Sequence, residues 1–275
     1  MNAPLPTHPS TPDRWRRVTR SALFDITQFI ILVLLMVWFF YRGTERLGYN
    51  WQWYLVPQYI GRFGETGFSM GPLLRGLMVT FKISAISLVL ALAIGLTTAL
   101  LRLSNAYVAR ALARVYLETS RNAPLLIQLF FIYFVVGPVI GLGRLPSAVL
   151  ALSLYEGAYA SEIFRAGIVS IDRGQWQAAH SLGLSVTDQY RFVILPQALR
   201  RISPPLTSQA ISLIKDSALV STIAIYDLTM QTQAVIAETF LTFELWFTAA
   251  AMYLLVTVSL SMVATYLERR FAVAG

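Results

Sequence analysis

The segment GQWQAAHSLGLSVTDQYRFVILP at residues 174–196 is polar and helix-forming, and it lies between apolar segments long enough to cross a membrane. Composition alone places the chain in lipid, whereas this segment indicates what the chain does there. A structured polar loop between membrane spans gives a soluble protein a defined surface to bind. The segment therefore predicts coupling between the spans and a soluble partner.

Two capping signals and one glycine predict two short helices in this region. Asp172 is placed to cap the first helix, and Gly183 lies where a left-handed residue would end it. Ser185 and Asp188 form a second capping pair three residues apart. The helix that they start is expected to break or kink at Pro196.

Small side chains on the first of these helices favour close contact with another protein. Ala178 and Ala179 would let a backbone or a groove wall approach, and a bulky residue there should block the contact. The alternative is a helix that lies along the lipid headgroups. The polar residues of the helix leave little apolar face for that role, and these are Gln175, Gln177, His180 and Ser181.

Composition indicates an integral membrane protein, because 56% of the 275 residues are hydrophobic and only 13% are charged. The net charge of +8 does not indicate nucleic acid as a partner, since the arginines are scattered at the ends of apolar runs and fit topology signals. Cysteine is absent, which excludes disulfides and Cys-ligated metals. The lone histidines His8 and His180 suggest no metal site, and no cofactor is expected.

Six apolar segments are predicted to span the membrane, each near the roughly 20 residues that a bilayer requires. The first follows a basic tail and resembles a signal peptide, but it is long enough to span and no small-residue cleavage site follows. The expected fold class is an all-α integral membrane protein with about six transmembrane helices. The predicted spans are 22–41, 74–101, 113–136, 146–167, 203–225 and 245–267.

The distribution of arginine predicts the orientation of these spans. Arginines gather in segments that alternate spans would place on one side, which is therefore the cytoplasm. The loop at 42–73 falls on the opposite side, where its aromatic residues fit the membrane interface. The cytoplasmic segments are the tail 1–21, the loop 102–112, the loop 168–202 and the tail 268–275.

The polar loop resembles the EAA loop of ABC importer permease subunits. That pattern is E-A-A, three residues, G, nine residues and I-x-L-P, and every spacing is kept here. Two identities depart from it: a glutamine replaces the glutamate, and a valine replaces the isoleucine. The amide can still form hydrogen bonds but not an ionic contact. The matching residues are Gln177, Ala178, Ala179, Gly183, Val193, Leu195 and Pro196.

Five further segments resemble the polar amino acid subfamily of these permeases, the type that includes histidine, glutamine and general L-amino acid permeases. Together with the loop they cover most of residues 73–230. They are LLRGLMVTFKIS at 73–84, RNAPLLIQLFFIYF at 121–134, GAYASEIFRAGIVSI at 157–171, LPQALRRISPPL at 195–206 and SLIKDSALVSTIAIYDL at 212–228.

The resemblance implies a bacterial inner-membrane importer built from several chains. The five-helix type I core would occupy 74–267, with an additional helix at 22–41 before it. The implied partners are ABC ATPase subunits, a second permease subunit that is a copy or a paralogue, an extracytoplasmic substrate-binding protein, a polar amino acid and membrane lipid. The phosphate-binding pattern G-x-x-x-x-G-K-[ST] is absent, since neither Lys82 nor Lys215 follows a glycine. ATP hydrolysis is therefore expected on a partner, and the chain itself is not expected to be an enzyme.

Ionisable residues in or near the spans are candidates for function, because charge in lipid is costly. Glu162, Lys215 and Asp216 are the candidates for the translocation pathway. For Glu162 the alternative is an ion pair, either with Arg165 one turn later or with another helix. Arg121 is expected to anchor a helix start rather than to bind substrate.

Two other classes of function are compatible with a polytopic chain. A secondary transporter or channel would move its substrate without ATP, but the paired broken helices of such transporters are not visible in this sequence. A membrane scaffold would use the polar loop to recruit a partner without transport. Dependence of uptake on the ATPase separates both from an importer.

Overall fold

The computed structural model describes residues 22–64 and 67–272, and these fall into two parts that meet between Trp51 and Gln52. The described residues of the first part contain one helix, α2 (Ala22–Leu47), which extends beyond the predicted span at 22–41. The predicted tail at 1–21 lies outside the described residues. The second part contains all the other elements, and each part is described by itself.

A short irregular segment leads into the helices of the second part. A 3₁₀ turn, η1 (Trp53–Leu55), and α3 (Pro57–Ile60) precede an antiparallel hairpin of β1 (Gly61–Gly64) and β2 (Gly67–Met70). The backbone amide of Gln52 donates a 2.7 Å hydrogen bond to the carboxylate of Glu244 in the last helix. The described part of the predicted aromatic loop from Gln52 onward is therefore folded, and Gln52 itself is hydrogen-bonded to the helical core.

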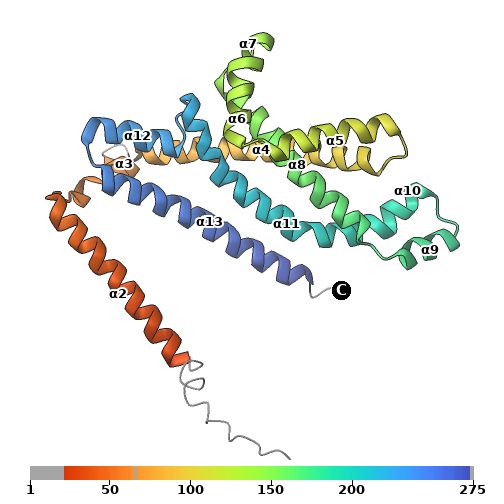
Figure 1. Ribbon diagram of the computed structural model, residues 1–275, viewed down its shortest axis with the longest axis horizontal. Coiled ribbons are helices and arrows are strands. Elements are labelled where there is room, and N and C mark those ends of the chain that lie inside the picture. The colour runs from red at the N-terminus through yellow and green to blue at the C-terminus, as the bar shows by residue number, and fades with distance from the viewer. Residues whose placement is uncertain (1–21, 65–66, 273–275) are drawn as a thin grey trace, which may run out of the picture. The chain divides into compact units, whose positions relative to one another are not determined.

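Two long helices, α4 (Pro72–Leu103) and α8 (Arg144–Val169), pack side by side at the centre of this part (Figure 1). Small and hydroxylated residues line their contact, as is common where membrane helices approach closely. The hydroxyl of Ser153 donates to the carbonyl of Val149 at 2.6 Å and lies 3.3 Å from the carbonyl of Ser87 on α4. The apolar cluster beside this contact contains Ile83, Leu129, Leu152, Leu213 and Val220.

The predicted span at 113–136 is not one straight helix, because the chain bends by 111° between α5 (Tyr107–Asn122) and the helical segment at 125–140. Pro124 cannot donate a backbone hydrogen bond and restricts the residue before it, so the helix ends there. The side-chain amide of Gln128 donates to the carbonyls of Ser120 and Ala123 at 2.7 and 2.9 Å. These bonds provide partners for carbonyls that the bend leaves without helical ones.

The helical segment after the bend has three pieces. It consists of α6 (Leu125–Phe130), a π-helical segment η2 (Phe131–Val136) and α7 (Gly137–Ile140), which ends at the left-handed Gly141. A π-helical segment also precedes α11 later in the chain. In both places a proline lies in the first turn of the next α-helix, where its missing N–H costs little.

The polar loop folds as α9 (Arg173–Ser181), α10 (Val186–Asp188) and the π-helical segment η3 (Gln189–Ile194), followed by α11 (Leu195–Asp216). Pro196 was expected to break or kink the helix, and a break is wrong. The backbone stays helical from η3 into α11 because Pro196 occupies the first turn of α11. The predicted fifth span at 203–225 also differs, since α11 ends at Asp216 and a 3₁₀ segment, η4 (Ser217–Ile223), follows.

The chain closes with α12 (Leu228–Thr239) and α13 (Thr242–Ala272). Within the described residues, α2, α4 and α13 are long and apolar enough to cross a membrane, and the bent segment would add a fourth span. Helices α8 and α11 fall short because they carry charged and hydroxylated residues, several of them on buried faces. An all-α membrane fold is thus confirmed.

Candidate functional site

The first half of the polar loop is a helix closed at both ends by local hydrogen bonds. The Asp172 carboxylate accepts a 2.6 Å bond from the amide of Gly174, which confirms the predicted cap. Gly183 has a φ of +72°, so the predicted left-handed stop is also confirmed. The amides of Gly183 and Leu184 donate to carbonyls in the last turn of α9, at 2.9 and 3.3 Å. These bonds fix the shape of the α9 terminus.

The two alanines of α9 have different surroundings. Ala179 is 2% exposed and packs inside the chain, whereas Ala178 and Gln177 are exposed. The small side chain at position 179 therefore serves packing within the loop, and only position 178 is open to another protein. This finding corrects the expectation that both alanines face a partner.

The second half of the loop packs back on α9 and on the start of α11. The Ser185 hydroxyl accepts from the amide of Asp188 at 3.2 Å and donates to its carboxylate at 2.6 Å, as the capping pair predicts. The rings of Trp176 and Tyr190 meet edge to face at 5.1 Å. Val193 joins this packing, with Ile194 fully buried, while Leu195 and Pro196 are exposed.

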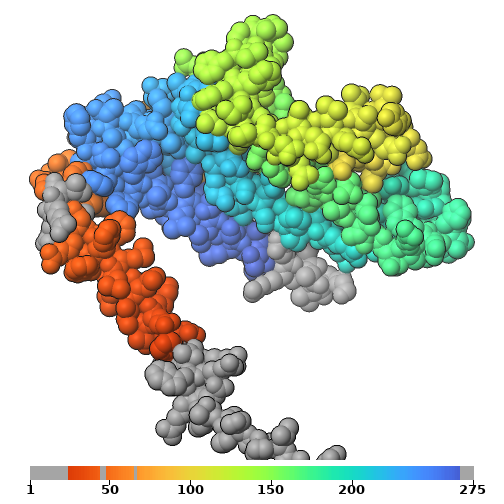
Figure 2. Space-filling model, in the orientation of Figure 1, coloured from red at the N-terminus to blue at the C-terminus, as the bar shows by residue number. Residues whose placement is uncertain are grey.

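Large apolar side chains are exposed on this loop although its sequence is mainly polar. Leu182 is 79% exposed, Val186 69% and Phe192 62%. In Figure 2 the segment that carries them forms one end of the second part. The α4–α5 turn lies toward the same end in Figure 1, so the two basic loops predicted to share one side do lie together. These exposed apolar side chains are candidates for contact with another molecule.

A second cluster forms around Glu162 on α8. Its carboxylate accepts hydrogen bonds from Arg102 of α4 at 2.5 Å, from Arg121 of α5 at 3.1 Å and from Arg165 at 3.3 Å. The predicted ion pair with Arg165 is thus present, together with two pairs between helices. Arg121 lies in the last turn of α5, so the expectation that it anchors a helix start is wrong.

A third cluster centres on Glu156, a residue that the sequence reasoning missed. Its side chain is 1% exposed, and its carboxylate accepts a short hydrogen bond from the Gln209 amide of α11. The carboxyl of Asp216 lies beside it. The signal for Glu156 was available, since it is an acidic residue six positions before Glu162 in an apolar stretch.

The three predicted pathway residues do not form one site. Glu162 belongs to the arginine cluster, and Asp216 belongs to the cluster around Glu156, about 9 Å further along α8 by helical rise. Lys215, the residue before Asp216, is exposed. Among the described residues, no group of three or more His, Asp or Glu side chains could hold a metal ion.

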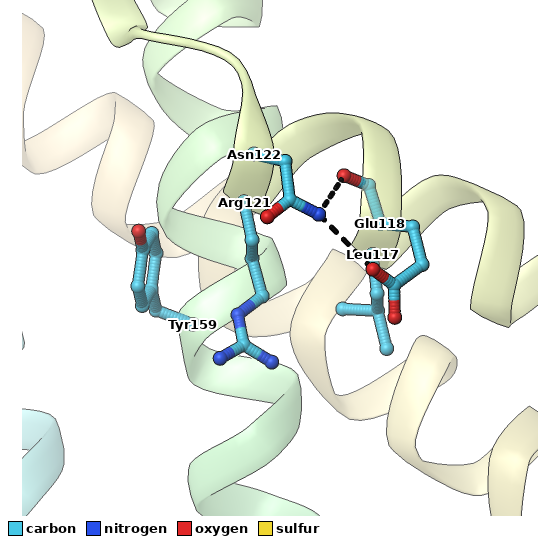
Figure 3. Close-up of a pocket in the computed structure, with 5 residues that line it drawn as sticks. All are labelled: Leu117, Glu118, Arg121, Asn122 and Tyr159. Carbon is cyan, nitrogen blue, oxygen red and sulfur yellow. Dashed lines mark hydrogen bonds between the residues drawn. The ribbon is translucent and has the colours of Figure 1, made fainter.

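A small polar pocket lies beside the arginine cluster, with a volume of about 240 Å³. Figure 3 shows Arg121 extending between the ring of Tyr159 and the side chain of Leu117, with Glu118 on the other side of Leu117. The amide of Asn122 donates to the Glu118 carboxylate at 3.0 Å. The pocket is lined by Leu117, Glu118, Arg121, Asn122 and Tyr159.

Comparison with known proteins identifies the family. Residues 91–273 match the family described as "Binding-protein-dependent transport system inner membrane component". The chain belongs to this family. Members are the permeases of ABC importers, so the expectation of such a permease, integral to the inner membrane, is confirmed.

The sequence of this permease is similar to those of several named permeases. It is 40% identical over 217 residues to the "Probable glutamine ABC transporter permease protein GlnP" of Bacillus subtilis, an alignment that covers 77% of this chain and 98% of that protein. It is 38% identical over 204 residues to the "Glutamine transport system permease protein GlnP" of Escherichia coli, covering 73% and 93%. The "L-cystine transport system permease protein TcyB" of B. subtilis is also 38% identical over 205 residues, covering 74% and 88%.

Solved structures support the same membership. The permease resembles a chain in the "Crystal structure of an amino acid ABC transporter with histidines", with a TM-score of 0.68 and 35% identity over 72% of this chain and 94% of that one. A chain of the MetNI methionine ABC transporter in an inward-facing conformation shares the fold, with a TM-score of 0.64 at 19% identity over 72% and 95%.

Proposed function

We propose that this permease moves polar L-amino acids inward across the bacterial inner membrane, driven by ATP hydrolysis on a separate subunit. The substrate class is supported by the relatives, whose names include glutamine and cystine permeases at 38–40% identity. The requirement for another subunit is supported by the chain itself, which has no phosphate-binding loop. The observation that carries the proposal is the capped loop with exposed apolar side chains.

The loop between Asp172 and Pro196 is the surface that binds the ATPase. Gln177 and Ala178 face outward on α9, and the nearby apolar side chains supply area that a protein groove can cover. The shape of the loop depends on Gly183 and Val193. Leu195 and Pro196 also shape it, and because they are exposed they can contact the ATPase as well. An amide at position 177 binds by hydrogen bonds instead of an ionic contact.

Movement of this loop reaches the membrane through α11. The loop is internally fixed by its caps and by the Trp176–Tyr190 contact, so it moves as one body. Helical backbone is continuous from α10 through η3 to α11, which carries Gln209 and Asp216 next to Glu156. Closure of the ATPase would thus shift polar groups in the interior, a rigid-body change between two packed states.

The pathway is assigned to the polar groups inside the helices. Asp216 and Glu162 are each held by specific partners, which is how charge persists in a membrane, and Lys215 is exposed next to Asp216 on α11. A zwitterionic substrate can pair its ammonium group with a carboxylate of the protein and its carboxylate with an ammonium group of the protein. The clusters differ in charge, so they would act at different steps.

The complete importer contains further components. These are two ATPase subunits, a second permease that is a copy or a paralogue, and an extracytoplasmic protein that delivers the substrate. Lipid surrounds α2, and both termini lie in the cytoplasm. This arrangement is supported by the arginine distribution and by the family to which the chain belongs.

The test is purification from native membranes in mild detergent, followed by uptake in proteoliposomes. We expect an ATPase in equal ratio to permease chains, and accumulation of L-glutamine only when ATP and a substrate-binding protein are present. An ATPase with its catalytic glutamate changed to glutamine is the control and should abolish uptake. Purification of the permease alone, with uptake that needs no ATP, would overturn the proposal.

A further inference from the structure

Helix α5 carries two opposite charges that lie close together but do not pair. Glu118 and Arg121 are three residues apart, a spacing that places their Cβ atoms about 5–6 Å apart on one helix face and favours an ion pair. No such pair is formed within the described residues. Both side chains are exposed, so a ligand from outside the helix can reach the two charges.

Each of the two side chains is held by a third group. The Arg121 guanidinium donates to the Glu162 carboxylate through Nη1 at 3.1 Å and lies 5.8 Å from the ring centre of Tyr159. The Glu118 carboxylate accepts from the Asn122 amide through Oε2 at 3.0 Å. Figure 3 shows the two charged ends on opposite sides of Leu117.

These contacts leave bonding capacity on both groups. Arg121 has Nε and Nη2 with no hydrogen bond in the described part of the chain, and Glu118 has Oε1. Nε and Nη2 form one edge of the guanidinium fork, which is the geometry that receives a carboxylate through two parallel bonds. An ammonium group is the natural partner for the remaining carboxylate oxygen.

The space between them suits a small polar ligand. Its volume of about 240 Å³ lies below the usual 300–1,000 Å³ of pockets for drug-sized molecules, as expected for a ligand of roughly ten heavy atoms. The pocket contains one cation and one anion, so its net charge is balanced. A zwitterion can satisfy both groups without adding net charge to the site.

We propose that this pocket binds the charged head of the transported amino acid, with Arg121 receiving the α-carboxylate and Glu118 the α-ammonium. The inference rests on the function proposed above and adds a specific station for the substrate. Tyr159 and Leu117 form the walls that direct the two charged groups. The pocket binds the α-carboxylate and α-ammonium groups, which all L-amino acids share. Selection among amino acids by their side chains must therefore occur elsewhere.

The test measures direct binding without the substrate-binding protein, because that protein also recognises the amino acid. The permease–ATPase complex in lipid nanodiscs is equilibrated with radiolabelled L-glutamine. Glu118→Gln keeps the shape of the side chain and the hydrogen bond with Asn122 but removes the charge. Arg121→Met removes the cation. Each variant is expected to weaken binding at least tenfold.

A matched control comes from the same helix. Arg114 is exposed on α5 two turns before Arg121 and is not among the pocket residues, so Arg114→Met makes the same charge change outside the site. It should bind L-glutamine as the wild type does. If Arg121→Met does not assemble, Arg121→Lys keeps the charge but loses the fork, and an intermediate loss is expected.

Competition with ligands that lack one charged group tests the same two contacts by changing the ligand instead of the protein. L-glutaminamide lacks the carboxylate and glutaramate lacks the ammonium, so both should compete at least tenfold more weakly than L-glutamine. In Glu118→Gln the disadvantage of glutaramate should disappear, whereas that of L-glutaminamide should persist.

The outcomes separate this inference from the proposed function. Wild-type affinity in Glu118→Gln, equal competition by the altered ligands, or ATP-driven uptake without measurable binding would overturn the pocket assignment alone. Absence of ATP-driven uptake by the wild type would overturn the proposed function, and the pocket assignment with it.

Discussion

Gly95 of α4 lies directly against Ala160 of α8, so closely that a Cβ atom added to the glycine would be 2.7 Å from the Cβ of the alanine. The same added atom would lie 3.0 Å from the backbone of Gly157 and Ser161. No side chain can be accommodated there without moving one helix. The contact between the two central helices is therefore set at this residue.

Gly95→Leu should separate α4 from α8 and destabilise the protein. Overpacking of a close contact costs about 1–3 kcal/mol, so we expect a lower unfolding temperature and less folded permease in the membrane. Ala93→Leu is the matched control, because Ala93 is exposed on the same helix. Thermal unfolding in detergent measures both, and equal stability of the two variants would contradict the assigned contact.

Glu162→Gln should destabilise the helix packing more than loss of any single arginine partner. The neutral side chain would leave three guanidiniums with no anion among them. The groups are partly exposed, so the cost is about 1–2 kcal/mol rather than that of a fully buried pair. Arg165→Met should cost less, since Glu162 keeps Arg102 and Arg121. Thermal unfolding at low and high salt measures the stability of both variants. A larger loss of stability in Arg165→Met than in Glu162→Gln would contradict the prediction.

Glu156→Gln should separate stability from transport. The carboxyl is almost fully buried beside another carboxyl, so a neutral amide of the same shape should leave the unfolding temperature unchanged or raise it. Transport should fall about tenfold or more if the polar cluster serves the substrate path. Unfolding scans and ATP-driven uptake are compared on the same preparation. Normal uptake would remove Glu156 and Asp216 from the pathway.

Gly183→Val should uncouple ATP hydrolysis from transport while the permease remains in the membrane. A β-branched residue cannot readily adopt the φ of +72°, so the end of α9 must change shape. Gly183→Asn is the control, because asparagine tolerates this conformation. The ratio of amino acid moved to ATP hydrolysed is the measurement. Wild-type uptake by Gly183→Val would refute the role given to the loop.

Ala178→Leu and Ala179→Leu should fail in different ways. Position 178 is exposed, so a larger side chain there blocks the ATPase surface without unfolding the loop. Position 179 is buried, so the same change disrupts packing and costs about 1–3 kcal/mol. ATPase binding and thermal stability are measured for both. An Ala178→Leu variant that binds the ATPase normally would show that this face is not the contact.

Short-range features were predictable from the sequence. The caps at Asp172 and Ser185 and the stop at Gly183 depend on residues within one turn, and all three were confirmed. The bend before Pro124 also had a local signal, but the apolar residues on both sides were interpreted as one span. Hydropathy indicates whether a segment lies in lipid or in water, but it does not show whether the chain bends within the segment.

Long-range features were not predictable. The contact between Arg102 and Glu162 joins residues 60 positions apart, and only the packing of α4 on α8 brings them together. Burial of Ala179 likewise depends on where the later residues of the loop fold back. The pocket on α5 was missed because its charges are informative only once their other partners are known.

The π-helical segment η3 determines how the loop is rotated about the axis of α11. Each residue of an α-helix advances the chain by roughly 100° around its axis, and a π turn accommodates one residue more than an α turn. Deletion of one residue from η3 could restore an α-helix of good geometry. It would also turn α9 by about that angle relative to Gln209 and Asp216, so the force from the ATPase would act in a different direction. The number of residues between Gly183 and Pro196 thus determines the direction in which movement of α9 is transmitted to α11.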